Sequence, residues 1–195
     1  MEHYASAVSL ASGRHGYFTA MEARGTGIRS CELVRWVKSG RLENPARGVY
    51  RVADYPPSPI DPYVLAVLSV GKDAVIYGES VLGVLNLAPT NPMRICVATP
   101  GRLRRKLGGG IKVVVAKVKS AWEYEGIPLQ EVSEAIRSAR GCVRDDRRIA
   151  AAREASRQGY VSRADCARLE RTIRNEASTY CRIFGADAPT SNSIV

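Results

Sequence analysis

Four prolines stand within the stretch 56–62 of this 195-residue chain, at Pro56, Pro57, Pro59 and Pro62. Proline fixes its own φ and lacks a backbone N–H, so neither a helix nor a strand is expected to run through residues 53–62. This segment predicts a boundary between a short N-terminal unit and a longer second unit. The length of the chain fits one or two compact units of about 50 to 150 residues.

The N-terminal unit is predicted to contain three helices followed by a hairpin. The helices are expected at residues 4–12, 19–24 and 30–39, with Thr19 capping the second. Glycines favour a turn at residues 25–27 and an end to the third helix at Gly40. Two short strands at 41–43 and 49–52, joined by a loop over 44–48, complete the order of elements of a winged helix-turn-helix.

The second unit is predicted to mix helices and strands. Periodicity indicates helices at 63–70 and 80–87, strands at 94–99, 111–118 and 121–126, and helices at 131–140, 144–158 and 162–176. Residues 185–195 are small and polar and are expected to fray. The fold class is therefore α+β: a winged helix-turn-helix at 1–53, a mixed α/β domain with a helical tail at 61–184, and a flexible end at 185–195. The two folded units are expected to have independent cores.

The net charge of +10 is unevenly distributed. Residues 1–52 carry 8 Lys and Arg against 4 Asp and Glu, and residues 101–120 carry 7 against none, while the arginine-rich remainder after residue 120 is almost neutral. A concentrated positive charge attracts polyanions, of which nucleic acid is the commonest in the cytoplasm. The charge thus points to two regions that are candidates for nucleic-acid contact.

The composition indicates an ordinary globular protein of the reducing cytoplasm. Hydrophobic residues make up 45% and charged residues 25% of the chain. The five cysteines are odd in number and widely spaced, which argues against a disulfide framework or a zinc site. No apolar run approaches the roughly 20 residues that span a bilayer, and no signal peptide is expected.

The third predicted helix is the candidate for reading DNA. Leu33, Trp36 and Val37 recur at helical spacing and are expected to pack inward. The opposite face and the hairpin supply groups that can contact base edges or phosphates: Arg29, Ser30, Glu32, Arg35 and Lys38 on the helix, and Arg41, Arg47 and Arg51 on the hairpin. A solvated helix face is the alternative, but the complete module favours binding to double-stranded DNA.

A second basic surface is predicted from the stretch 102–119. It comprises Arg102, Arg104, Arg105, Lys106 and Lys112, with Lys117 and Lys119 following. The triple glycine at 108–110 is not a P-loop, because no Gly-Lys-Ser/Thr follows it. Three interpretations stay open: an extension of the phosphate-contacting surface, a dock for an acidic toxin or RNA, and a solvated charge run.

Enzymatic patterns are weak in this sequence. The two histidines, His3 and His15, lack a nearby nucleophile or carboxylate pattern and are expected at the surface. Asp145 and Asp146 with Glu154 could be imagined as magnesium ligands, but a capping role at a helix start is favoured. No catalytic residue, metal site or cofactor is therefore predicted, and the chain is expected not to be an enzyme.

Several motifs together resemble the AbiEi-type antitoxins of type IV toxin–antitoxin systems. They are Gly-Tyr-Phe-Thr-Ala-Met-Glu-Ala at 16–23, Leu-Val-Arg-Trp-Val-Lys-Ser-Gly-Arg-Leu at 33–42, Arg-Gly-Val-Tyr at 47–50, and, in the second unit, 75–80, 82–87, 95–100 and 125–129. The resemblance covers roughly residues 10–140. After Pro128 the chain departs from it, reading Leu-Gln-Glu-Val-Ser-Glu where many members carry a Thr/Ser-Pro-x-Arg-Thr stretch.

The resemblance implies a division of labour. The N-terminal domain would repress its own operon at inverted repeats, and the C-terminal domain would counter a nucleotidyltransferase-like toxin, without a stable complex between the two being assumed. Two alternatives remain open. The first is a nucleic-acid-processing enzyme that uses the winged domain for targeting, and the second is an interaction module whose winged fold binds protein.

Overall fold

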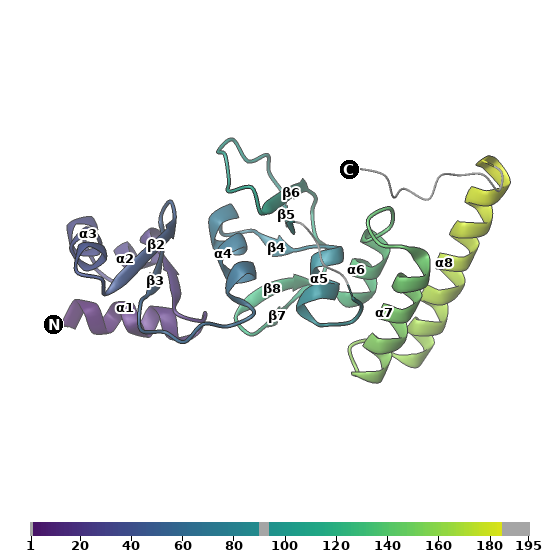
Figure 1. Cartoon of the computed structure of the whole chain (residues 1–195), viewed down its shortest axis with the longest axis horizontal. Helices are drawn as coiled ribbons and strands as arrows, with labels where there is room; N and C mark the ends of the chain where they lie inside the picture. The colour runs from purple at the N-terminus through teal and green to yellow at the C-terminus, as the bar shows by residue number, and fades with distance from the viewer. Residues whose placement is uncertain (1, 90–93, 185–195) are drawn as a thin grey trace.

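A computed structural model describes residues 2–89 and 94–184 of the chain. The elements are strung along one axis, with a helix-turn-helix unit at one end, a mixed sheet in the middle and a helical hairpin at the other end (Figure 1). The α+β class expected from the sequence is confirmed. The predicted flexible end at 185–195 lies outside the described residues.

Residues 2–52 form the first unit, here called the HTH unit. Its elements are α1 (Glu2–Ser12), β1 (Tyr17–Thr19), α2 (Ala20–Gly25), α3 (Ser30–Lys38), β2 (Leu42–Ala46) and β3 (Val49–Val52). The strands form an antiparallel sheet in the order β1-β3-β2. This is the expected order of helices and hairpin, with β1 as an addition that the sequence did not indicate because it has only three residues.

Local sequence signals set the ends of α2 and α3. The Thr19 hydroxyl accepts from the Glu22 N–H at 3.2 Å and the Glu22 carboxylate accepts from the Thr19 N–H at 2.8 Å, a complete capping box. Gly27 adopts a φ of 85° between the two helices, where a side chain would be strained. The N–H groups of Gly40 and Arg41 donate to the carbonyls of Val37 and Trp36 and end α3.

The HTH unit has its own hydrophobic cluster. Phe18, Ile28, Leu33 and Trp36 are buried in it. The ring of Tyr4 on α1 meets the Trp36 ring edge-on at 5.3 Å between centroids, so α1 packs directly on α3. Val37 is partly buried against the same cluster, and the inward face predicted for α3 is therefore confirmed.

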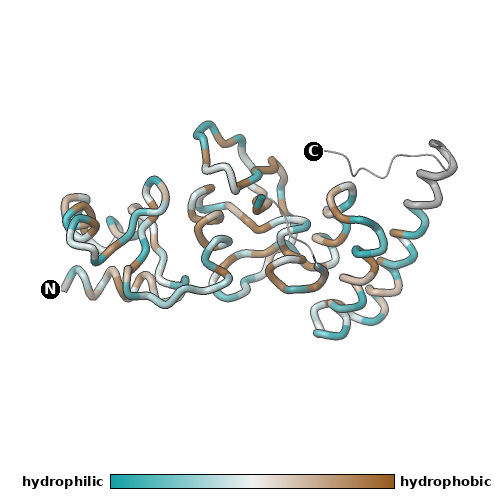
Figure 2. Tube along the Cα trace, in the orientation of Figure 1, coloured by the Kyte–Doolittle hydropathy of each residue, from teal (hydrophilic) through white to brown (hydrophobic). Residues whose placement is uncertain are grey.

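The second unit is built around a five-stranded mixed sheet. The strands are β4 (Val75–Ile76), β5 (Ile95–Thr99), β6 (Ile111–Val115), β7 (Ala121–Tyr124) and β8 (Ile127–Gln130), in the order β6-β5-β4-β8-β7. The β5–β6 and β4–β8 pairs are parallel, and the β4–β5 and β7–β8 pairs are antiparallel. Helix α4 (Asp61–Val70) contacts β5 and β8, and α5 (Glu79–Val84) contacts β5. Figure 2 shows apolar segments concentrated in α4 and the neighbouring strands.

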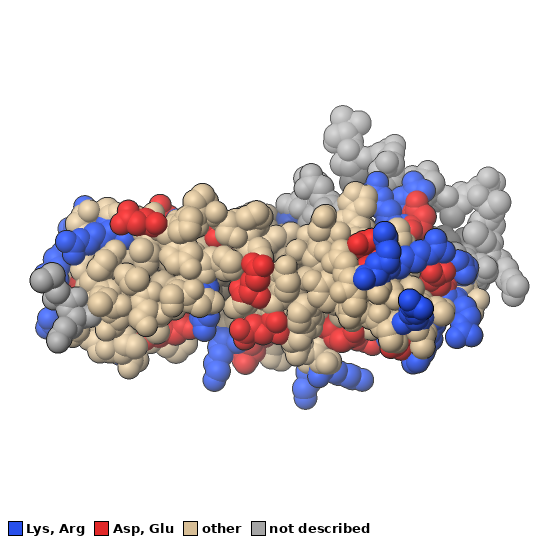
Figure 3. All heavy atoms as spheres, turned by 90° about the horizontal axis from the view of Figure 1, so that it is seen from below, with Lys and Arg blue, Asp and Glu red and all other residues tan. Residues whose placement is uncertain are grey.

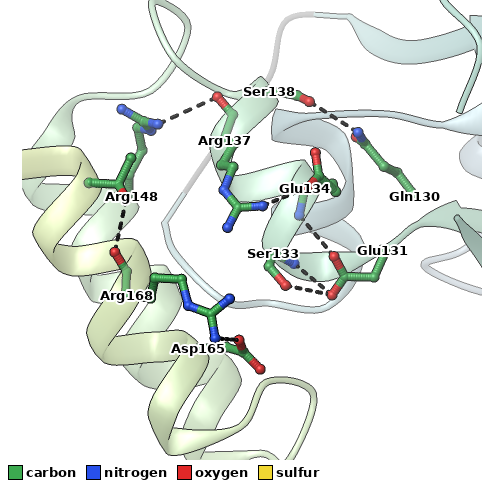
Figure 4. A network of polar contacts seen from close by, with 10 residues as sticks. Gln130, Glu131, Ser133, Glu134, Arg137, Ser138, Arg148, Asp165 and Arg168 are labelled. Carbon is green, nitrogen blue, oxygen red and sulfur yellow. Dashed lines mark hydrogen bonds and ion pairs between the residues drawn. The ribbon is translucent and has the colours of Figure 1, made fainter. Parts of the chain in front are cut away.

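Three helices follow the sheet: α6 (Val132–Ser138), α7 (Asp145–Arg157) and α8 (Arg163–Phe184). The Glu131 carboxylate caps α6 by accepting from the Ser133 and Glu134 N–H groups, and the Gln130 amide donates to the Ser138 hydroxyl at 3.0 Å (Figure 4). These contacts tie the end of β8 to α6. Helices α7 and α8 pack on each other as a hairpin.

Arg148 joins the three helices from a fully buried position, with 0% of the residue exposed. Its guanidinium donates to the Ile136 carbonyl at 3.0 Å, to Asp145 at 2.9 Å and to Glu176 at 3.1 Å. A buried guanidinium must have all its donors satisfied to be tolerated. Arg148 therefore holds the C-terminal end of α6 against α7 and α8.

The two units meet through several contacts rather than through the proline segment alone. Tyr17 and Val49 of the HTH unit are buried in the large hydrophobic cluster of the second unit. Gly126 lies so close to the carbonyl oxygen of Gly13 that a Cβ at this position would clash with it. The HTH unit has a cluster of its own, but the expectation of fully independent cores is wrong for these two side chains.

Several predicted boundaries differ in the structure. Helix α4 begins inside the proline segment, since Pro62 lies in its first turn, where a missing N–H costs nothing. Strand β2 continues through Pro45 to Ala46 because a bulge between Glu43 and Ala46 accommodates the proline. Strands β4 and β8 were not predicted. Helix α8 continues past residue 176 to Phe184.

Candidate nucleic-acid interface

The outer face of α3 is the first part of the candidate interface. Ser30, Cys31, Val34, Arg35 and Lys38 are exposed along it, while Leu33 and Trp36 are buried on the other side. Arg29 is exposed just before the first turn of the helix. The structure thus brings four of the five predicted helix residues, Arg29, Ser30, Arg35 and Lys38, to one accessible surface.

Glu32 is the exception, and its prediction as a base-contacting residue is wrong in this structure. The residue is only 9% exposed, and its carboxylate accepts from the Arg29 N–H at 2.9 Å and bonds the His3 ring at 3.0 Å. The Arg29 backbone N–H and then the His3 ring hold the pKa of Glu32 below its usual range. Glu32 caps α3 and ties it to α1, so it does not face a ligand.

Val34 is the residue on this face that the sequence did not single out. Its side chain is 51% exposed between Ser30 and Lys38, four residues from each. An apolar side chain at this position can contact a thymine methyl group in a major groove. The helical spacing from Ser30 and Lys38 was the signal that could have identified it.

The β2–β3 hairpin supplies the second part of the interface. Arg47 is exposed at the tip, and Arg41 is exposed at the base, where its guanidinium lies over the Tyr4 ring at 5.4 Å from the centroid. Within the described residues, Arg35, Lys38 and Arg47 have no ion-pair partner. Their charges are therefore available to an anion outside the chain.

Arg51 is the second predicted DNA-contacting residue that is buried in the structure. It is 8% exposed, and its guanidinium donates to the Tyr55 carbonyl at 2.8 Å and to Asp61 at 3.4 Å. It also lies over the Tyr17 ring. Burial, followed by the Asp61 charge, raises the pKa of the Tyr17 phenol. Arg51 joins the hairpin to the start of α4 instead of reaching DNA.

The second predicted basic surface lies on the β5–β6 connection and β6. Arg102, Arg104, Arg105, Lys106 and Lys112 are all exposed, on a segment that extends away from the rest of the sheet in Figure 1. Arg105 differs from the others, because its guanidinium donates to the last carbonyls of α4, those of Ser69 and Val70. It satisfies the end of that helix, and the other four remain open to solvent.

The acidic residues considered for catalysis have separate arginine partners. Asp145 pairs with Arg148 at 2.9 Å, Asp146 pairs with Arg144 at 3.2 Å, and Glu154 pairs with Arg157. Over residues 2–89 and 94–184, no group of three or more His, Cys, Asp or Glu is placed to hold a metal ion. Asp145 and Asp146 thus stabilise the start of α7, and Glu154 forms an ion pair in its last turn.

The histidines and cysteines also have structural surroundings. His3 is half-exposed beside Glu32, and the His15 ring bonds the Glu125 carbonyl at 3.1 Å where the two units meet. Cys31, Cys96, Cys142 and Cys166 are free thiols. In the part of the chain that the structure describes, no helix has both the length and the apolar character needed to cross a membrane.

Comparison with known proteins bears on the HTH unit. Residues 7–53 match the family model described as "Transcriptional regulator, AbiEi antitoxin". The match confirms the resemblance stated from the sequence over the N-terminal part of the chain and ends at the proline segment. No match was found among curated proteins.

Proposed function

We propose that the chain is an autoregulatory transcription repressor and antitoxin that binds double-stranded DNA through its HTH unit. One observation carries the proposal: the family match covers 7–53, the same stretch that folds into a helix-turn-helix with an exposed basic face. Helix order, an outward polar face and a basic hairpin are the features expected of a winged DNA-binding module.

In this proposal α3 lies in the major groove. Arg29 and Ser30 are at its N-terminal end, which enters the groove first, and Arg35 is one turn further along. Arg35 would donate to a guanine edge, Val34 would contact a thymine methyl, and Lys38 would bind phosphate. Arg47 at the hairpin tip would contact the flanking backbone or minor groove, with Arg41 at its base.

The antitoxin role is proposed for residues 61–184. The family description names an antitoxin, while the match itself covers residues 7–53, so the assignment to 61–184 rests on the resemblance of the sequence. The proposed toxin is a nucleotidyltransferase-like protein, with or without direct contact. The same description supports a regulator rather than an enzyme. Operator sites would be inverted repeats in the chain's own promoter in a type IV system. A gene for such a toxin next to this one would strengthen the proposal.

Mobility shifts with the chain's own promoter test the DNA-binding half of the proposal. The full chain is expected to prefer the promoter to a random duplex of the same length, because the exposed side chains of Arg35 and Val34 would face the bases in this proposal. Raising the salt concentration should weaken both complexes through loss of counterion release. Equal affinity for promoter and random DNA would overturn the repressor role.

Co-expression tests the antitoxin half. The chain and the neighbouring toxin are placed under separate inducible promoters, so that repression cannot account for protection. A variant with Arg35→Ala and Arg47→Ala is expected to lose operator binding and keep protection, since both residues lie outside 61–184 and are exposed on the HTH unit. Loss of protection in this folded variant would show that the two activities are not divided in this way.

A further inference from the structure

Strand β6 is the outer strand at one edge of the five-stranded sheet. It pairs in parallel with β5, from Ile95 opposite Ile111 to Thr99 opposite Val115, and no described strand pairs with its other side. Its sequence, Ile-Lys-Val-Val-Val, has high β propensity and a single charge. Val115 is 60% exposed at its end. A free apolar edge of this kind is a template for another strand.

The hydrogen-bond pattern shows which backbone groups are free. Ile95 donates to the Gly110 carbonyl at 2.7 Å, and Ala116 donates to the Thr99 carbonyl at 3.0 Å. In a parallel ladder the backbone groups alternate in direction, so Lys112 and Val114 direct theirs toward β5. Val113 and Val115 consequently direct their N–H and C=O groups outward, where they can pair with an added strand.

The charge around this edge identifies the chemistry of an added strand. Residues 101–120 carry seven Lys and Arg and no Asp or Glu, and Lys112, Lys117 and Lys119 lie on β6 or directly after it. A second copy of the chain would bring the same positive charge to the edge and be repelled. An acidic strand would be attracted.

The opposite edge of the sheet is different. Strand β7 carries Glu123, and its Trp122 ring packs on Tyr124 and on Tyr160 from the turn between α7 and α8. A charge on an edge strand discourages pairing with a like-charged strand, so Glu123 disfavours an acidic strand at β7, whereas Lys112 does not disfavour one at β6. In the described structure β6 contacts chiefly β5, and Figure 1 shows it beside the projecting β5–β6 connection.

We propose that the edge of β6 binds an extended acidic segment of a partner protein as a sixth strand. Main-chain hydrogen bonds to Val113 and Val115 would hold the segment, and the surrounding lysines and arginines would select for acidic side chains. The inference concerns a surface separate from α3 and the hairpin. The proposed peptide binding can therefore be tested independently of DNA binding.

The test uses the full chain and a short labelled peptide in which glutamate alternates with valine. Saturable binding is expected, with slowed amide hydrogen exchange at Val113 and Val115. Val115→Pro removes an outward N–H that the ladder with β5 does not use, so it should weaken binding about tenfold or more. Val115→Thr keeps the N–H and the β-branched shape and should bind like the original chain.

A charge variant keeps the test decisive if Val115→Pro perturbs the fold. Lys112→Glu with Lys117→Glu leaves the backbone donors in place and should abolish binding of the acidic peptide. Three results would overturn the proposal: binding that survives both variants, binding of single-stranded nucleic acid that is tighter than peptide binding and insensitive to Val115→Pro, and self-association through β6 without peptide. Absence of measurable peptide binding to the original chain would overturn it as well.

Discussion

The two ends of the molecule are both rich in arginine, yet they use it differently. On the HTH unit, Arg35, Lys38 and Arg47 point to solvent without an ion-pair partner among the described residues. On the α7–α8 hairpin most arginines meet a carboxylate of a neighbouring turn or helix, as Arg153 meets Glu170 at 2.8 Å and Arg168 meets Asp165 at 3.1 Å. Figure 3 shows blue and red side chains interleaved at this C-terminal end.

The two ends thus differ in how many of their positive charges are paired with carboxylates within the described residues. An arginine that already has a carboxylate partner must give up that contact before it can bind phosphate. An exposed arginine without a partner releases counterions from DNA at little cost. The near neutrality of the sequence after residue 120 anticipated this contrast, and the contacts on α7 and α8 explain it.

The largest expected effect is on stability, at Arg148. Arg148→Met removes a buried guanidinium, which leaves the Ile136 carbonyl without this donor and leaves Glu176 with only the longer Arg140 contact at 3.7 Å; this should cost about 3 kcal/mol in the free energy of unfolding. Chemical denaturation measures this loss. DNA affinity under conditions where the variant is folded should not change, and a stability equal to that of the original chain would show that Arg148 does not hold the helices together.

The next effect concerns DNA discrimination. Arg35→Ala should reduce the preference for promoter over random DNA by about 1 to 3 kcal/mol, because it would remove the proposed base contact. Arg153→Ala is the matched control at the other end, since Arg153 is engaged with Glu170 and should leave DNA binding unaltered. A competition assay separates them. Equal losses of promoter preference in both variants would show that free and paired arginines do not differ in DNA binding.

A comparable test contrasts the exposed Arg47 and the buried Arg51 of the β2–β3 hairpin. Arg47→Ala should weaken binding to specific and random DNA alike, by about 1 kcal/mol for one phosphate contact, without altering stability. Arg51→Ala should instead lower stability, because Arg51 is buried against Tyr55 and Asp61. Thermal melts and anisotropy titrations on both variants provide the measurement. The reverse outcome would mean that Arg51, and not Arg47, faces the DNA.

The smallest effect is a pH dependence within the HTH unit. Partial burial alone would raise the pKa of Glu22, but hydrogen bonds from Thr19 and Arg14 outweigh burial and hold this pKa below its usual value. The stabilisation by the ionised carboxylate is therefore present at neutral pH and is lost as the pH falls below about 4. Glu22→Gln should lower stability at neutral pH and lose its disadvantage in acid, as followed by denaturation at several pH values.

Much of the fold could be predicted because its signals are local. Thr19 and Glu22 mark the start of α2, Gly40 marks the end of α3, and the prolines mark the join between the units. Strands β4 and β8 could not be predicted in this way. Strand β4 has only two residues, and β8 contains Pro128. Both depend on partners that are distant in the sequence: Val75 of β4 pairs with Ala98 of β5, and Ile76 of β4 pairs with Leu129 of β8.

The exposed basic face of α3 and the hairpin could be predicted in outline, but two of the predicted residues, Glu32 and Arg51, are buried. Glu32 is four residues before the buried Trp36 and three after Arg29, a spacing that favours an inward or capping position. Arg51 is two residues after the buried Val49, so strand alternation places both on one face. What no local signal gives is the partner of Arg51, because Asp61 belongs to the next unit.

The salt dependence of promoter binding tests the central claim, that the free cations of α3 and the hairpin bind duplex DNA. It is measured for the original chain and for a variant with Arg35, Lys38 and Arg47 all changed to alanine. Each lost phosphate contact reduces the slope of log K against log salt by about 0.9, so loss of the proposed Lys38 and Arg47 phosphate contacts should make the slope smaller by about 2, while Arg35 is assigned to a base edge. An unchanged slope would contradict the claim.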